Sequence, residues 1–185
     1  MGLEVDYINR DRDLVEQAKQ ANQLAQYQLY QKYAKAMFNV SHRMMNNFEE
    51  AEDVLQDAFI DIFRRLHTFR YESSIGFWIK SIVINKCINA LKKRKIDMFL
   101  SEDVMKYEKI DEQNMNDDQI SYDVSQLRDQ IGKLPEGYRV IFSLYTMEGY
   151  DHEEISQILN ISVSTSKTQY MRAKNRIRES IKSQQ

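Results

Sequence analysis

The chain has 185 residues and a net charge of −2, a length that allows one large domain or two small ones, each with a modest core. No apolar run approaches the ~18 residues that cross a membrane, and the N-terminal segment is too charged for a secretory signal. The single cysteine, Cys87, excludes an intramolecular disulfide and fits a reducing cytosol. We therefore expect a cytoplasmic protein without a membrane-inserted segment.

The composition predicts an all-α protein, because the chain has one proline, five glycines and few alternating β-branched runs. Charge is segregated along it: basic residues concentrate at 80–95 and 167–182, and acidic residues at 97–129. Segregation of this kind matters more for nucleic-acid binding than the net charge. Because residues 96–123 are acidic and lack sustained periodicity, we expect a flexible linker there, between small helical domains at 1–95 and 124–185.

Helical periodicity in the first half predicts helices at about 11–20, 23–45, 48–66 and 75–95. Asn47, with Glu50 three residues later, can cap the third of these. The second is expected to bury Leu24, Leu29 or Tyr30, Tyr33, Met37, Phe38 and Met44.

The helix at 48–66 has two dissimilar faces. One is a core stripe of Leu55, Ala58, Phe59, Ile62 and Leu66. The other carries mostly charged and polar residues, with two apolar ones among or beside them: Asp53, Gln56, Asp57, Ile60, Asp61, Phe63 and Arg64. Single exposed apolar residues are common, so this face fits an ordinary solvated surface. It fits equally well a docking surface for a basic helical partner.

Residues 68–76 are predicted to form a loop, with Ser73 or Ser74 capping the helix that follows. That helix has a core face of Val83, Ile84, Cys87, Ala90 and Leu91. Its other face carries Trp78, Ser81, Asn85, Asn89 and Lys92. An aromatic ring beside amides and a lysine can bind single-stranded nucleic acid by stacking and hydrogen bonding. A buried Trp78 with satisfied asparagines is the alternative.

In the second half, a helix around Leu127, Ile131 and Leu134 is expected to stop at Pro135. A further helix at 136–147, expected to end before Gly149, should bury Tyr138, Ile141, Phe142 and Tyr145.

Residues 148–181 predict a helix-turn-helix. Asp151 and Glu154 form a capping-box pattern before a stripe of Ile155, Ile158 and Leu159, and Ser162 can cap a second helix from Val163. On this second helix small hydroxyl residues and arginines oppose an apolar face, which suits close approach to base edges and phosphates. An ordinary amphipathic helix pair with a solvated basic face is the alternative.

Two stretches resemble extracytoplasmic-function sigma factors, the two-domain class of the sigma-70 family. They are EEAEDVLQDAFIDIFRRLHTFRYESSIGFWIKSIVINKCINALKKRK at 49–95 and LPEGYRVIFSLYTMEGYDHEEISQILNISVSTSKTQYMRAKNRI at 134–177. The resemblance implies an RNA polymerase sigma factor. Its region 2 domain at 1–95 would bind core polymerase and melt the −10 promoter element, and its region 4 domain at 124–185 would read the −35 element. The implied partners are promoter DNA and the β′ clamp helices and β flap of bacterial core RNA polymerase, and the resemblance allows an anti-sigma factor.

The same resemblance implies roles for individual residues. Those expected to face the polymerase are Asp53, Gln56, Asp57, Ile60 and Phe63. Those expected at the −10 element, with Asn85 at a flipped base, are Arg70, Tyr71, Ser73, Ser74, Trp78, Lys80, Asn85, Lys86, Asn89 and Lys92. Those expected at the −35 major groove are Ser164, Thr165, Lys167, Thr168, Met171, Arg172 and Arg176.

Two positions depart from the family pattern. Ser166 stands on the core side of the recognition helix where an aliphatic residue is usual, and its hydroxyl can bond back to the Ser162 carbonyl. Ser164 stands where glycine is frequent and adds a hydroxyl that can contact DNA. Both weaken any inference of the promoter sequence.

An enzyme is not expected. His152 and Glu153 resemble the start of a zinc-protease helix, but Ser156 stands where the second histidine belongs. The three histidines are far apart and no glycine-rich phosphate loop occurs, so we expect no metal and no cofactor. The main alternative function is a helix-turn-helix repressor or activator with a helical dimerisation domain, which would bind a symmetric operator by itself. A helical adaptor is a third possibility, disfavoured by the two basic helix faces.

Overall fold

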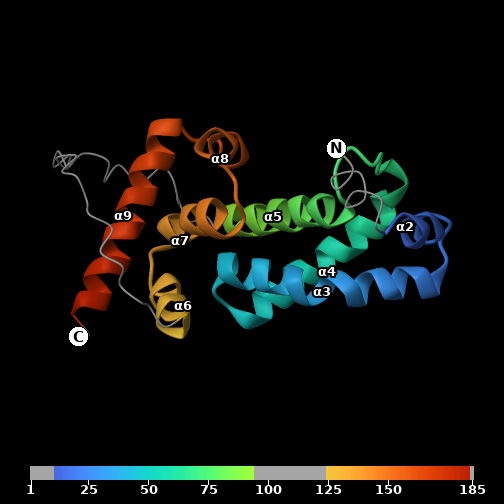
Figure 1. Cartoon of the computed structure of the whole chain (residues 1–185), viewed down its shortest axis with the longest axis horizontal. Helices are drawn as coiled ribbons and strands as arrows, with labels where there is room; N and C mark the ends of the chain where they lie inside the picture. Colours follow the sequence, from blue (N-terminus) through green and yellow to red (C-terminus); the bar gives the residue numbers. More distant parts are fainter. Residues whose placement is uncertain (1–10, 94–123, 184–185) are drawn as a thin grey trace, which may run out of the picture. The chain divides into compact units, whose positions relative to one another are not determined.

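The computed structural model describes residues 11–93 and 124–183, and within these ranges the chain forms helices and no strand (Figure 1). This confirms the all-α fold class. The chain divides into two compact units, Met1–Arg94 and Lys95–Gln185, and each is considered by itself. The predicted linker at 96–123 lies outside the described residues, as do Arg94 and Lys95 at the predicted end of the fourth helix. None of the described helices is long and apolar enough to span a membrane.

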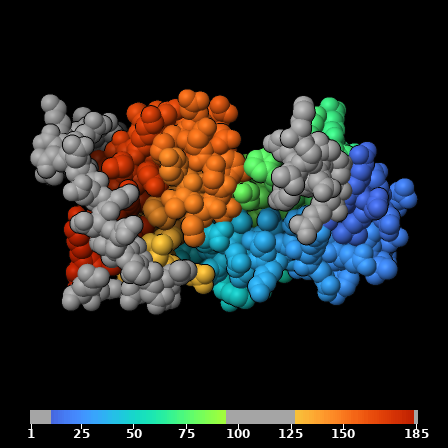
Figure 2. All heavy atoms as spheres, in the orientation of Figure 1, coloured from blue at the N-terminus to red at the C-terminus, as the bar shows by residue number. Residues whose placement is uncertain are grey.

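The first unit contains α2 (Arg12–Lys19), α3 (Gln23–Met45), α4 (Phe48–Arg65), the short 3-10 helix η1 (Leu66–Thr68) and α5 (Ile75–Lys93). The long helix α3 packs against α2, α4 and α5. In Figure 2 the blue surfaces of α2 and α3 adjoin one another. Asparagines begin two of these helices: Asn22 Oδ1 accepts from the Ala25 amide at 3.1 Å, and Asn47 Oδ1 accepts from the Glu50 amide at 3.0 Å.

The buried stripe of α3 runs through Ala25, Leu29, Met37, Val40 and Met44. The prediction that Leu24 is buried is wrong, because its side chain is 65% exposed. Leu24 lies about 100° around the helix from its neighbour, so the small Ala25 occupies the buried position instead.

The core stripe predicted for α4 is buried throughout, including Leu66 at the start of η1. In α5, Val83, Ile84, Cys87 and Leu91 are buried as predicted. The start of this helix lies directly on α3, since a Cβ added at Gly76 would come within 2.9 Å of the Tyr33 ring.

The second unit contains α6 (Val124–Gly132), α7 (Glu136–Phe142), the π-helical segment η3 (Ser143–Met147), α8 (His152–Leu159) and α9 (Val163–Lys182). The helix α9 packs against α6, α7 and α8. Its buried residues join those of α6, α7 and the turn between them in one core cluster: Ile131, Leu134, Phe142, Ala173, Ile177 and Ile181. This core fixes one side of α9 and leaves its other side to solvent.

The helix predicted at 136–147 is α-helical only as far as Phe142. It continues as a π-helical segment, in which the Glu148 amide donates to the Ser143 carbonyl five residues earlier, at 3.1 Å. The wider turn changes the angular position of the side chains that follow. As a result Tyr145 is 38% exposed, and its predicted burial is wrong.

Candidate nucleic-acid interface

The face of α5 opposite its core stripe is open to solvent. Asn85, Asn89 and Lys92 are exposed, and Trp78 and Ser81 are partly exposed. The alternative of asparagines satisfied within the core therefore does not apply. The Trp78 ring packs against the buried Phe69, with ring centroids 5.5 Å apart, which fixes one face of the indole. The arrangement provides an aromatic ring and two amides on one helix face, as stacking and hydrogen bonding to unpaired bases require.

Two lysines of the predicted −10 surface have partners within the unit. Lys86 Nζ lies 2.6 Å from Asp61 Oδ2 of α4. This hydrogen bond to Lys86 is the main reason that the pKa of Asp61 lies below its usual value. Lys80 Nζ lies 5.8 Å from the centre of the Phe77 ring. Lys86 is thus directed toward α4. To bind Lys86, a DNA phosphate would have to share the lysine with Asp61 or displace the Asp61 carboxylate.

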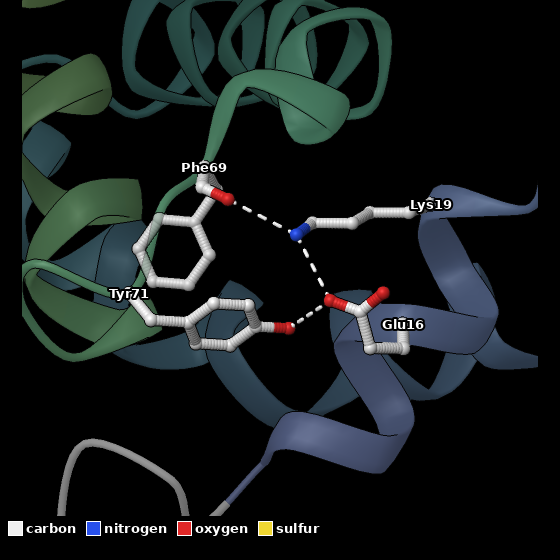
Figure 3. A network of polar contacts seen from close by, with 4 residues as sticks. All are labelled: Glu16, Lys19, Phe69 and Tyr71. Carbon is white, nitrogen blue, oxygen red and sulfur yellow. Dashed lines mark hydrogen bonds and ion pairs between the residues drawn. The ribbon is translucent and has the colours of Figure 1, made fainter.

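The loop at residues 69–74, between η1 and α5, is held by α2. Tyr71 Oη donates to Glu16 Oε1 at 2.5 Å, and Lys19 Nζ donates to the Phe69 carbonyl at 3.0 Å (Figure 3). Lys19 also pairs with Glu16 at 2.9 Å, which closes the network. Burial and the hydrogen bond to Glu16 raise the pKa of Tyr71 well above its usual range. The last loop residue, Ser74, accepts from the Phe77 amide at 3.2 Å and begins α5.

This network contains two residues, Glu16 and Lys19, that the sequence did not single out. Their only signal in the sequence is an i,i+3 pair of opposite charges, which is common on helix surfaces. Among the loop residues predicted to bind the −10 element, Arg70 is exposed, and Tyr71, Ser73 and Ser74 are partly exposed.

The opposite side of α4 from its core stripe carries the residues expected to face a polymerase. Asp53, Gln56 and Asp57 are exposed, and Ile60 is 49% exposed between them. Phe63 is partly exposed and packs against the buried Phe59, with centroids 5.9 Å apart. Carboxylates around an exposed apolar side chain can receive a basic helical surface with an apolar centre.

The start of α8 is the capping box that the sequence predicts. Asp151 Oδ1 accepts from the amides of Glu153 and Glu154, each at 2.8 Å, and Glu154 Oε2 accepts from the Asp151 amide at 2.8 Å. Asn160, with φ of 58°, ends the helix in a left-handed conformation. Ser162 Oγ then accepts from the Thr165 amide at 3.0 Å and begins α9, as predicted.

The solvent side of α9 contains every residue expected at the −35 element. Ser164, Lys167, Met171 and Arg176 are exposed, and Thr165, Thr168 and Arg172 are partly exposed. At the front of the helix, Ser162 Oγ contacts Ser164 Oγ at 2.8 Å and Thr165 Oγ1 at 2.7 Å. Further along, the Arg176 guanidinium lies 5.4 Å from the centre of the Tyr138 ring. These contacts hold the three hydroxyls close together at the front of α9.

Ser166 is fully buried, but its hydroxyl does not have the predicted partner. The Ser166 Oγ lies 2.9 Å from Nδ1 of His152 on α8, while the Ser162 carbonyl accepts from the backbone amide of Ser166 at 3.0 Å. The His152 ring also stacks on Tyr145, with centroids 4.4 Å apart. Burial, then the nearby Lys167, lower the pKa of His152 below its usual value, so the ring is neutral at pH 7.

Thus a cross-helix bond between a serine and a histidine joins α8 to α9 where the family pattern has an aliphatic contact. Sequence reasoning considered His152 only as a metal ligand and missed this role. The sequence did contain a signal for it: Ser166 stands at a position expected to be buried, and His152 stands at the start of the preceding helix.

Comparisons with known proteins agree with this architecture. The family model described as Sigma-70 region 2 matches residues 29–96, and the one described as Sigma-70, region 4 matches residues 125–177. The chain is 28% identical to the ECF RNA polymerase sigma factor SigW of Bacillus subtilis, over 91% of this chain and 95% of SigW. It is 29% identical to the RNA polymerase sigma-H factor of Pseudomonas aeruginosa, over 91% and 92% of the two chains.

Solved structures show the same fold. CnrH, in complex with the cytosolic domain of CnrY, matches with a TM-score of 0.55 and 20% identity over 95% of this chain and 99% of that chain. The sigma factor RpoE of Bartonella quintana, in complex with the anti-sigma factor NepR, matches with a TM-score of 0.55 and 20% identity over 84% and 96% of the two chains. The chain therefore belongs to the sigma-70 family and is an RNA polymerase sigma factor of the extracytoplasmic-function class.

Proposed function

We propose that this sigma factor directs promoter-specific initiation through three surfaces: α4 for core polymerase, α5 with the 69–74 loop for the −10 element, and α9 for the −35 element. The observation that carries the proposal is the presence of two chemically different candidate DNA surfaces. The α5 surface offers an indole and amides, which suit unpaired bases. The α9 surface offers small hydroxyls and arginines at the front of a helix-turn-helix, which suit the major groove of a duplex.

At the −10 element, the protein acts without covalent chemistry. Capturing an unstacked base on the Trp78–Asn85 face and binding the strand backbone with Lys80, Asn89 and Lys92 offset the unpairing cost of a few kcal/mol. The loop residues Arg70, Tyr71, Ser73 and Ser74 close over the captured base. We accordingly propose that the protein is not an enzyme and needs no metal or cofactor.

At the −35 element, α9 enters the major groove with its hydroxyl residues foremost. Ser164, Thr165 and Thr168 approach base edges, and Arg172 reaches a base or a phosphate. Lys167, Met171 and Arg176 flank the groove.

The polymerase partner is proposed to contact α4 through the β′ clamp helices, and region 4 through the β flap. The exposed Ile60 surrounded by Asp53, Gln56 and Asp57 supports the first contact. Such a protein acts where polymerase and DNA are, in the cytoplasm. An anti-sigma factor is a further proposed partner, because RpoE was solved in complex with the anti-sigma factor NepR, and CnrH in complex with the cytosolic domain of CnrY.

The test is runoff transcription with purified bacterial core polymerase on a genomic promoter library, with and without this protein. We expect discrete new transcripts whose promoters share two upstream elements. An absence of transcripts together with tight, symmetric duplex binding by the protein alone would instead indicate a helix-turn-helix repressor. We expect Ile60→Ala to weaken binding to core polymerase and Arg65→Ala, an exposed residue away from this face of the same helix, to leave it unchanged. Equal losses would indicate a general effect on α4.

A further inference from the structure

We infer that α2 holds the 69–74 loop in the conformation that closes over the unstacked −10 base, with Glu16 and Lys19 as positioning residues. This inference rests on the proposed function of α5 and the loop. Neither residue belongs to the candidate DNA surface; both act through Phe69 and Tyr71, the loop residues that they contact.

The contact made by Lys19 fixes the start of the loop. Its ammonium donates to the backbone carbonyl of Phe69 at 3.0 Å and lies 4.5 Å from the centre of the Tyr71 ring. A bond to a backbone carbonyl restrains the path of the chain itself, and the cation over the ring restrains the following aromatic side chain. Lys19 therefore holds two of the six loop residues from a helix that lies fifty positions earlier in the sequence.

The contact made by Glu16 fixes the middle of the loop. Tyr71 donates its hydroxyl to this carboxylate at 2.5 Å, and the Arg12 guanidinium lies 5.0 Å from the centre of the same ring. Tyr71 has φ of 62°, a left-handed conformation that a residue with a bulky side chain rarely adopts. Such a conformation persists where the surrounding contacts favour it, and here α2 supplies those contacts.

The loop conformation is connected to the proposed base-binding face by ring packing. The Phe69 ring contacts Tyr71, with centroids 4.8 Å apart, and contacts Trp78 at 5.5 Å. A loop that moved away from α2 would therefore alter the packing around Trp78. Holding the loop before DNA arrives removes an ordering cost that capture would otherwise carry.

The helix α2 has its own anchor, so its loop contacts can be removed without undocking it. Val15 and Ala18 are fully or almost fully buried against the unit, and Gln26 of α3 donates to the Ala18 carbonyl at 3.3 Å. By contrast, the Glu16 side chain is about half exposed. The substitution Glu16→Ala therefore removes the loop contact and keeps a good helix-forming residue.

The first measurement is acrylamide quenching of tryptophan fluorescence in the full-length free protein. Trp78 is the only tryptophan in the sequence, so the signal comes from the one α5 ring that packs against Phe69 of the loop. We expect Glu16→Ala and Lys19→Met to increase quenching, and Lys19→Arg to restore most of the protection. The control is Gln17→Ala, which shortens an exposed, uncharged side chain on the same helix. Unchanged quenching in both Glu16→Ala and Lys19→Met would overturn the inference.

The second measurement uses holoenzyme formed with core polymerase and a forked promoter from the transcription screen. A 2-aminopurine replaces the proposed flipped base in the single-stranded −10 segment. We expect Glu16→Ala to weaken capture by roughly three- to tenfold while leaving polymerase affinity and −35 duplex binding unchanged. Equal losses in base capture, polymerase affinity and −35 duplex binding would show that α2 only stabilises the fold, and would overturn the inference.

A double-mutant cycle with Tyr71→Phe tests the contact directly. If Glu16 acts through the Tyr71 hydroxyl, the two substitutions together should cost clearly less than the product of their separate fold-losses. Full multiplicativity would contradict the inference. A wild-type holoenzyme that failed to capture the strand would refute the proposed function itself, whereas normal wild-type capture with a fully active Glu16→Ala would refute only the role of α2.

Discussion

The two candidate DNA surfaces are held in place in different ways. On the second unit, the contacts that begin α8 and α9 join residues two or three positions apart, as in the Asp151 bonds to Glu153 and Glu154. On the first unit, the 69–74 loop is held by Lys19 and Glu16, which lie 50 and 55 positions from their partners. The starts of α8 and α9 are thus set by neighbours in the chain, and the 69–74 loop by tertiary contacts.

If the two surfaces are held independently, substitutions on α5 and substitutions on α9 should affect different steps of initiation. We expect Asn85→Ala to give the largest effect, a loss of about 1–3 kcal/mol in the free energy of open-complex formation, because the polar edge of the captured base would lose its partner. Permanganate footprinting measures the melting, and −35 binding by the holoenzyme should stay normal. If the variant melted the promoter as well as the wild type does, Asn85 would not be the residue that binds the captured base.

The corresponding change on the second unit is Arg172→Ala. If this arginine reads a base, promoter recognition should weaken by about 1–3 kcal/mol, and the loss should disappear on promoters with a scrambled −35 element. Competition binding of holoenzyme to the two promoters measures both values. Lys182→Ala, at the exposed end of the same helix, is the matched control. An equal loss on scrambled DNA would show that Arg172 contacts phosphate instead.

A smaller effect should follow from removing a local contact. Asp151→Ala deletes the acceptor of two amide bonds at the start of α8, so we expect a loss of about 0.5–2 kcal/mol in the stability of the second unit. Hydrogen exchange of the α8 and α9 amides measures it, and Glu153→Ala is the control from the same turn. The quenching of Trp78 should not change. A change in Trp78 quenching would show that the second unit affects the conformation of the 69–74 loop.

The smallest effect concerns pH. The pKa of His152 is lowered in the folded protein, so its contribution to stability is present above its usual value of 6.5 and is lost as the pH falls below it. The pKa of Glu16 is lowered chiefly by the Tyr71 hydrogen bond, so its contribution is present above 4.5 and is lost only below that. As the pH falls from about 7.5 to about 5.5, the protection of the α8 and α9 amides, corrected for the pH dependence of intrinsic exchange, should therefore decrease, while Trp78 quenching stays constant.

The variant His152→Phe keeps a ring against Tyr145 but cannot be protonated, and should be less sensitive to pH than the wild type over this interval. If both proteins respond alike, another group is responsible.

Local patterns in the sequence predicted most of the fold. The cap at Asn47, the capping box at Asp151 and the cap at Ser162 all involve neighbours in the chain, and the structure contains each of them. The core stripes of α4 and α5 follow from helical periodicity. The roles of individual residues in binding polymerase and DNA were inferred from family resemblance, and they remain predictions.

The features that the sequence did not predict arise from packing between helices or from a change of helix type. The bond between Ser166 and His152 requires the crossing of α8 and α9, which no spacing in the sequence specifies. The exposure of Tyr145 follows from the π-helical segment, whose residues do not differ in kind from those of an α-helix. The network of Glu16, Lys19 and Tyr71 forms only after α2 has docked on the rest of the unit.

The long chain separation of that network also has a consequence for the order of folding. Contacts between near neighbours form quickly, whereas those that close a long stretch of chain form more slowly. When an unfolded full-length chain refolds, the turn between α8 and α9 can therefore form early. The 69–74 loop must wait until α2 has docked on α3. In such a refolding experiment the start of α9 would then be set before the 69–74 loop.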